Sequence, residues 1–211
     1  MRADSCQKIT DVYAEKLRRY FHQNTTLSDE VINAVISVSR PRKYKKGEFF
    51  SKQGEFFNKL AYVCSGIFNV SHTQENGTLF VVTFLKEGDF VQSTFEISKP
   101  GILTNQALCD TVVMEAQMKS INDIYLKYPQ LESHARSRIE KYLVVNAFHM
   151  IQIGTNKALD NYLLFRKNFD GYENRIPQHL IAAYLGITPT QLSRIKKTLS
   201  SEQQARKSIT P

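Results

Sequence analysis

The hydrophobic positions of the chain follow two patterns, a strand-like one in its middle and helix-like ones on either side. In the middle, short apolar runs alternate with glycines that are 12, 11 and 11 residues apart: Gly54, Gly66, Gly77 and Gly88. Turn signals at this pitch are typical of short strands in an all-β sandwich or barrel. The apolar runs that we expect to be strands are 60–64, 67–70, 79–85 and 111–116.

One pair of these strands carries a specific turn signal. Asn76-Gly77 lies between two β-rich runs, and both residue types tolerate a positive φ. The pattern therefore predicts a hairpin closed by a type I′ turn, in which both central residues have positive φ.

Helical spacing dominates on either side of the strands. Short amphipathic helices are predicted at 4–21 and 27–38, the second capped at Ser28. A brief helix at 120–128 is expected to stop at Pro129, and the longest helix is expected from Leu131 to Ile153.

The second half of that long helix, residues 143–151, is apolar on more than one face. Such a helix needs cover on both sides. The β unit is expected on one side and a second helix on the other, and the residues alone leave open whether that helix belongs to the same chain or to another.

Residues 178–195 match the demands of a helix-turn-helix, in which two helices cross steeply over a short turn. Ala182 is small enough for the crossing, and Gly186 suits the positive φ of the turn. Thr188 and Pro189 are a typical cap and first-turn proline for the second helix. The apolar positions that would lock the helices together are Ile181, Leu185, Ile187, Leu192 and Ile195.

The opposite face of the second helix is polar and basic, which an arbitrary helical hairpin would not require. Arg194 can bind the O6 and N7 atoms of guanine, and Gln191 can bind adenine in the same bidentate way. We therefore predict DNA binding, with Arg194 as the main base reader and Gln191 as the second. The full set of predicted DNA contacts is Gln178, Thr188, Thr190, Gln191, Arg194, Lys196 and Lys197.

The distribution of charge agrees with this prediction. The chain has 211 residues and a formal net charge of +8. Residues 166–211 hold eight basic and three acidic side chains, an excess of five. A localised basic excess is what a phosphate-backbone partner needs.

The chain resembles the catabolite-activator/FNR (Crp/Fnr) family of bacterial transcription regulators, and its residues 175–195 are similar to a Bacteroidetes-like branch. Segments 44–48, 53–55, 63–66 and 85–90 carry the likeness in the β unit. The resemblance implies an α+β fold: an N-terminal double-stranded β-roll (a cyclic-nucleotide-binding-like jelly roll), a long central dimerisation helix and a C-terminal helix-turn-helix. The implied domains are 1–129, 130–154 and 155–211.

The resemblance also implies partners: a homodimer joined along the central helix, double-stranded DNA bound at two half-sites, and RNA polymerase as a further candidate. It implies a transcription regulator. An enzyme is not expected, because His72 is the only histidine between residues 23 and 133 and cannot form the ligand set that metal catalysis in a β-roll needs. A rival hypothesis of another class is a small-molecule-binding β-roll module that uses the helix-turn-helix as a partner surface.

The sequence departs from the family where cyclic nucleotides bind. Gln92 and Ser93 stand where Gly-Glu is expected, and Gly101 aligns with the arginine that holds the cyclic phosphate. Between residues 88 and 118 the only basic residue is Lys99, which lacks the bidentate fork of arginine. We therefore predict no tight binding of cyclic AMP or cyclic GMP. The candidate pocket residues for another effector are Phe90, Gln92, Ser93 and Lys99.

No cofactor is predicted, while an unidentified small-molecule effector is left open. Three scattered cysteines form no metal or iron–sulfur pattern, and five histidines have no spacing that indicates haem. No apolar run is long enough to cross a membrane, and the first 21 residues are too charged for a secretion signal. We expect a soluble cytoplasmic protein.

Two further segments, 40–46 and 200–211, carry basic residues that could contact nucleic acid. The run from Arg40 to Lys46 could contact nucleic acid, but a solvated strand face is favoured. Residues 200–211 are polar and lack the strand pattern of the wing that follows the recognition helix in many family members. This tail is predicted to be disordered, with Arg206 and Lys207 available to phosphates.

Overall fold

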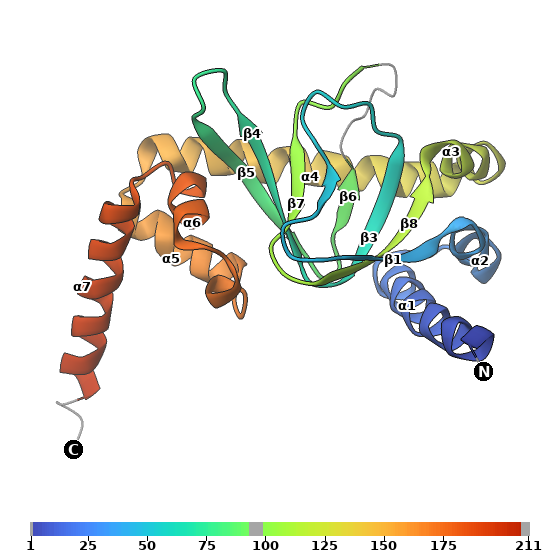
Figure 1. The fold of residues 1–211 in the computed structure, drawn as a ribbon, viewed down its shortest axis with the longest axis horizontal. Helices are drawn as coiled ribbons and strands as arrows, with labels where there is room; N and C mark the ends of the chain where they lie inside the picture. The colour runs from blue at the N-terminus through green and yellow to red at the C-terminus, as the bar shows by residue number, and fades with distance from the viewer. Residues whose placement is uncertain (1, 93–98, 208–211) are drawn as a thin grey trace.

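The computed structural model describes residues 2–92 and 99–207 (Figure 1). Two helices open the chain, α1 (Arg2–Asn24) and α2 (Asp29–Val38), and the β unit and the remaining helices follow. The strands are β1 (Arg40–Tyr44), β2 (Phe49–Ser51), β3 (Lys59–Ser65), β4 (Ile67–Thr73), β5 (Leu79–Lys86), β6 (Phe90–Gln92), β7 (Thr104–Ala107) and β8 (Thr111–Gln117). The later helices are α3 (Met118–Lys127), α4 (Pro129–Thr155), α5 (Ala158–Asn168), the 3-10 turn η1 (Glu173–Arg175), α6 (Gln178–Tyr184) and α7 (Pro189–Lys207).

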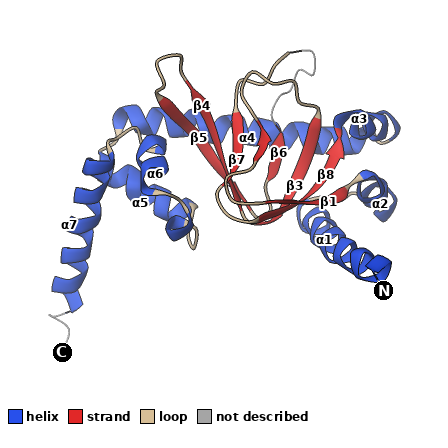
Figure 2. Cartoon of the chain, in the orientation of Figure 1, coloured by secondary structure: helices blue, strands red, loops and turns tan. Residues whose placement is uncertain are grey.

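The strands form two four-stranded antiparallel sheets, in the orders β1-β8-β3-β6 and β2-β7-β4-β5 (Figure 2). Alternate side chains of each strand point into the space between the sheets, as the period of a strand dictates. That interior is filled by one apolar cluster: Tyr44, Phe50, Ala61, Val63, Phe68, Val91, Ala107 and Val113. The predicted α+β fold with an N-terminal β-roll, a long helix and C-terminal helices is confirmed.

The β4–β5 hairpin forms where Asn76-Gly77 predicted it, but the turn type is different. Gly77 has φ +81°, whereas no non-glycine residue among the described ones has positive φ, so the type I′ prediction was wrong. The amide of Gly77 donates to the Gln74 carbonyl, and the amide of Gln74 donates to the Thr78 carbonyl, each at 2.9 Å. This is a longer loop built on a type I turn, which needs positive φ only at its final glycine.

The long central helix α4 is confirmed and starts two residues earlier than predicted, at Pro129. Proline is suited to the first helical position, because its missing N–H would have no partner inside the helix there. Pro129 therefore both ends α3 and opens α4. Ser28 is the N-cap residue of α2, as predicted, although its side chain makes no capping hydrogen bond.

The C-terminal tail is more ordered than predicted. Helix α7 continues to Lys207, so the prediction of disorder from residue 200 was wrong for residues 200–207. Its last turns contain good helix formers, including glutamine, alanine, arginine and lysine, and their propensity explains the extension. The rest of the predicted tail, 208–211, lies outside the described residues.

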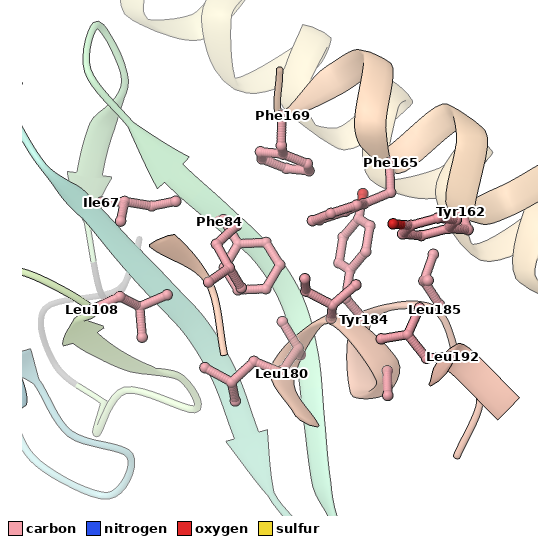
Figure 3. Close-up of a cluster of buried hydrophobic side chains, with 14 residues drawn as sticks. Ile67, Phe84, Leu108, Tyr162, Phe165, Phe169, Leu180, Tyr184, Leu185 and Leu192 are labelled. Carbon is pink, nitrogen blue, oxygen red and sulfur yellow. The ribbon is translucent and has the colours of Figure 1, made fainter. Parts of the chain in front are cut away.

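The C-terminal helices pack against the outer face of the β2-β7-β4-β5 sheet. Phe84 of β5 lies 5.5 Å from the Phe169 ring, 5.6 Å from Tyr184 and 6.2 Å from Phe165, measured between ring centroids (Figure 3). Ile67 belongs to the same buried cluster, so sheet and helices share one core. This shared core sets the position of the helix-turn-helix relative to the β-roll.

Candidate nucleic-acid interface

Helices α6 and α7 form the predicted helical pair. Ala182 is buried at the crossing, and its carbonyl accepts a 3.0 Å hydrogen bond from the amide of Ile187. Gly186 has φ +67°, in the left-handed region that glycine adopts without strain. Ile181, Leu185 and Leu192 are buried between the helices. The apolar pattern thus fixes the angle at which α7 leaves the turn.

The first turn of α7 is held by a capping box. The Thr188 hydroxyl accepts a hydrogen bond from the Gln191 amide at 3.2 Å. In return, Gln191 Oε1 accepts hydrogen bonds from the Thr188 amide at 2.9 Å and from the Thr188 hydroxyl at 3.2 Å. Reciprocal bonds of this kind satisfy backbone donors that the helix itself cannot pair.

The capping box competes with the predicted role of Gln191 in DNA reading. Bidentate recognition of adenine needs the side-chain oxygen to accept from N6 while the side-chain nitrogen donates to N7. Both lone pairs of Gln191 Oε1 are already occupied by Thr188. Gln191 can therefore read adenine only by giving up its cap, and Arg194 faces no such cost.

The other predicted contacts lie on one exposed surface. Thr188 is exposed just before α7, and Thr190 and Arg194 are exposed on its first two turns. An open groove of about 590 Å³ runs beside them and is lined by Gln178, Pro189, Ser193, Lys196, Lys197, Ser200 and Ser201. The fold therefore brings Gln178, from the start of α6, together with the two lysines of α7.

Lys196 differs from its neighbours because it is already paired. Its Nζ lies 2.8 Å from Glu173 Oε1, and its side chain is only 32% exposed. Among the described residues, neither Arg194 nor Lys197 enters such an ion pair, and both are exposed. Lys196 thus joins α7 to η1, while Arg194 and Lys197 remain directed at solvent.

Glu173 is the residue that the sequence analysis missed. It accepts a hydrogen bond from the Tyr162 hydroxyl, and its Oε2 lies 3.3 Å from Arg166 Nε. Burial acts to raise the pKa of Glu173, but the hydrogen bonds from Lys196 and Tyr162 outweigh it, and the pKa falls below its ordinary value. A rare acidic residue within this basic segment was the available signal.

Helix α4 supports the turn of the helix-turn-helix from behind. The His149 ring stacks on Tyr184 with centroids 3.9 Å apart, and its Nε2 lies 3.1 Å from the Tyr184 carbonyl. A Cβ added to Gly186 would lie 2.9 Å from the Cγ2 of Ile153. Glycine is therefore needed here twice, for the φ of the turn and for the close approach to α4.

Away from the helix-turn-helix, most of the circumference of α4 is apolar and open to solvent. No charged residue lies between Lys141 and Lys157. The exposed large side chains of this stretch, defined here as the α4 face, are Leu143, Val144, Val145, Phe148, Met150 and Ile151, each 54–67% exposed. Exposed apolar patches of this kind mark interaction surfaces in soluble proteins.

The predicted effector residues lie apart from this interface. Phe90 is half-buried against α1 and α4, where the guanidinium carbon of Arg138 lies 4.2 Å from its ring centroid. Its neighbour Val91 belongs to the cluster that fills the roll. Gln92 is half-buried at the end of β6 and Lys99 is exposed, while Ser93 lies outside the described residues.

Within the described residues, no group of three or more His, Cys, Asp or Glu side chains could hold a metal ion. Over the same part of the chain, no helix is long and apolar enough to span a membrane.

One protein-family model matches the part of the chain that forms the β-roll. Residues 41–128 match the family described as the cyclic nucleotide-binding domain. These residues run from β1 to the end of α3, so the β-roll is the part of the chain that carries this match. No curated protein matches the chain.

Solved structures show the same fold over most of the chain. FixK2 from Bradyrhizobium japonicum has a TM-score of 0.72 and 19% identity, covering 79% of this chain and 86% of its own. The c-di-GMP responsive global regulator CLP from Xanthomonas campestris has a TM-score of 0.69 and 14% identity, with 83% and 93% covered. The catabolite activator protein of Thermus thermophilus has a TM-score of 0.54 and 19% identity, with 87% of each chain covered.

Proposed function

We propose that this protein is a homodimeric, sequence-specific DNA-binding transcription regulator of the Crp/Fnr type, acting in the cytoplasm. The observation that carries the proposal is the pairing of a helix-turn-helix, whose second helix exposes Arg194 and Lys197, with a long helix whose α4 face has no cover. The relatives in fold include regulators by their own descriptions.

The α4 face supplies the dimer contact. Burying a large apolar side chain contributes roughly 1.5–3 kcal/mol, and a twofold axis repeats every contact. A second copy of α4 would cover Val144, Phe148 and Ile151, which recur at helical spacing, with the same residues of its partner. The two α7 helices would then face neighbouring half-sites of a near-palindromic DNA site. RNA polymerase is the further partner that such a regulator would contact.

The roles of Arg194 and Lys197 in DNA binding can be separated by substitution. We expect Arg194→Ala to weaken specific binding by about 1–3 kcal/mol and to relax base preference at one position of each half-site. We expect Lys197→Ala to weaken all sequences alike and to reduce the salt slope by about one. Selection from random duplexes followed by titration at several salt concentrations measures both.

Gln191→Glu is the informative variant for the capping residue. A glutamate at this position keeps the acceptor for the Thr188 amide, so the helix start is preserved. It removes the amide donor that adenine N7 would need. If Gln191 reads a base, the variant should prefer a different base at one position of each half-site. Its unfolding free energy should stay within about 0.5 kcal/mol of the wild-type value.

The same selection distinguishes the rival hypothesis. A β-roll module that uses the helix-turn-helix only as a partner surface would enrich no DNA sequence. Equal losses on every duplex for Arg194→Ala and Lys197→Ala would contradict the assigned roles.

The regulator is proposed to act without cyclic AMP. The segment from 88 to 118 contains one basic residue, Lys99, and by the family resemblance Gly101 stands where the phosphate-binding arginine is expected. An anionic phosphate in a half-buried pocket needs a matched cation. Isothermal titration should show no micromolar binding of cyclic AMP, and affinity in that range would overturn this part of the proposal.

A further inference from the structure

One carboxylate connects three segments of the C-terminal helical region. Glu173 opens η1, and its side chain is only 19% exposed. The hydroxyl of Tyr162, in α5, donates to Glu173 Oε1, and the Nε of Arg166, in the same helix, lies 3.3 Å from Oε2. Lys196 of α7 completes the set, with its Nζ 2.8 Å from Oε1. These contacts tie α7 to two elements that precede the helix-turn-helix.

The carboxylate of Glu173 is fixed in place and charged. Burial opposes its ionisation, but the hydrogen bonds from Lys196 and Tyr162 and the charge of Arg166 outweigh burial, so the pKa of Glu173 lies below its ordinary value. The Tyr162 side chain that holds Oε1 is itself buried. The charge of Lys196 is therefore compensated within the folded chain.

The two adjacent lysines of α7 differ in what they offer to DNA. Both line the open groove beside the helix, and Arg166 does not. Lys197 is exposed and enters no ion pair within residues 2–92 and 99–207, whereas Lys196 is held at Glu173. An ammonium beside a carboxylate brings no net positive charge to a phosphate, so it releases few counterions. Moving Lys196 to a phosphate would leave a half-buried carboxylate without that partner, which is costly.

We propose that Glu173 withholds Lys196 from the DNA backbone, so that Lys196 is a positioning residue of α7 and not a phosphate contact. This inference rests on the proposed DNA-binding function, and it differs from the contact that the helical position of Lys196 predicts. The ion pair lowers the part of the affinity that comes from phosphates and leaves base reading to Arg194. Less of the protein is then held on unrelated DNA.

The test is the salt dependence of DNA binding by the full chain, measured by fluorescence anisotropy on a duplex of random sequence. Glu173→Gln keeps the size of the side chain and removes its charge. We expect this variant to raise the affinity at about 0.1 M salt by roughly threefold or more and to steepen the salt slope by about one, because Lys196 can then reach a phosphate. A purely structural role of Glu173 would lower stability and leave the slope unchanged.

A double-mutant cycle assigns the change to Lys196. Lys196→Gln should reduce the salt slope by about one in the Glu173→Gln background, and by less than about half as much in the wild-type background. The double variant has the net charge of wild type and should return to the wild-type slope. Lys197→Gln should reduce the slope by about one in both backgrounds.

Glu132→Gln is the matched control for the loss of one negative charge. Glu132 is 53% exposed near the start of α4 and lies 3.7 Å from Arg136 of the same helix. The start of α4 lies beside α3, far from α7 (Figure 1). This variant should keep the wild-type slope. A rise equal to that of Glu173→Gln would assign the effect to net charge and overturn the proposal.

Urea unfolding of each variant keeps the test decisive. If Glu173→Gln is too unstable to titrate, Lys196→Gln and Lys197→Gln in the wild-type background decide: equal losses of slope overturn the proposal, and a smaller loss at Lys196 supports it. An unchanged slope in a folded Glu173→Gln variant also overturns it, while the DNA-binding function stands. Wild-type protein that binds no duplex at any salt concentration would overturn the proposed function itself.

Discussion

Helix α4 has an inner face, turned to its own chain, and an outer face, open to solvent, and the apolar residues are concentrated on the outer one. Toward its own chain, His149 stacks on Tyr184 and Ile153 lies against Gly186. Away from it, Leu143 and Phe148 are each 60% exposed. The inner face positions the helix-turn-helix within one chain, and the outer face is free to position two chains relative to each other.

The difference shows what each face requires of its residues. The inner face needs a close fit to the helix-turn-helix: Gly186 lets the backbone approach Ile153, and the backbone carbonyl of Tyr184 accepts from the imidazole N–H of His149. The outer face needs only apolar area and the absence of charge, and no charged residue lies between Lys141 and Lys157. Substitutions on the inner face should therefore alter stability within the chain, and those on the outer face should alter assembly.

The largest expected effect comes from a charge on the outer face. Phe148→Glu should abolish the dimer, because it removes on the order of 2 kcal/mol of apolar burial per protomer and places a carboxylate at the contact. Analytical ultracentrifugation should show a monomer, and affinity for a palindromic site should fall by more than tenfold.

Leu126→Glu is the matched control for that experiment. Leu126 is 84% exposed on α3, outside the α4 face, so a charge there should leave the dimer intact. If both variants dimerise like wild type, the outer face is not the dimer contact.

An effect of similar size, on folding and not on assembly, is expected where the sheet meets the C-terminal helices. Phe84 is 2% exposed and packs on three aromatic rings, so Phe84→Ala should cost about 3–5 kcal/mol of unfolding free energy. Phe80 lies on the same strand and is 42% exposed, and Phe80→Ala should cost under about 1 kcal/mol. Urea unfolding measures both, and equal losses would mean that the helices do not share a core with the sheet.

The sequence predicts elements better than it predicts these contacts. Local residue types were enough for the hairpin at Gly77, the turn at Gly186 and the cap at Thr188, because each demand arises within a few positions. The pattern of 143–151 also showed that α4 is apolar on more than one face. Which face the chain itself covers depends on where Tyr184 packs, and no local pattern encodes that position.

The same limit applies to the site. The exposed positions of Arg194 and Lys197 followed from helical spacing, whereas the pairing of Lys196 with Glu173 depends on how η1 meets α7. Tertiary packing, and not propensity, decides such features.

The smallest predicted effect concerns the inner face and pH. Burial lowers the pKa of His149 below its ordinary value, partly opposed by its hydrogen bond to the Tyr184 carbonyl. The unfolded chain therefore binds a proton at a higher pH than the folded chain does, and the sign follows from linkage. The stability that the neutral His149 imidazole contributes is therefore fully present above about pH 6.5, the pKa of an unfolded histidine. It is lost as the pH falls below that value.

His149→Gln tests that sign. Glutamine can still donate to the Tyr184 carbonyl but does not titrate, so the variant should lose less stability than wild type between pH 7.5 and 5.5, read from urea midpoints. The pKa of His134 is also lowered by burial and by Arg138, so His134→Gln should remove a further part of the slope. Parallel pH profiles for wild type and His149→Gln would show that the imidazole has the same pKa in the folded and the unfolded chain. That result would contradict the burial of His149 against Tyr184.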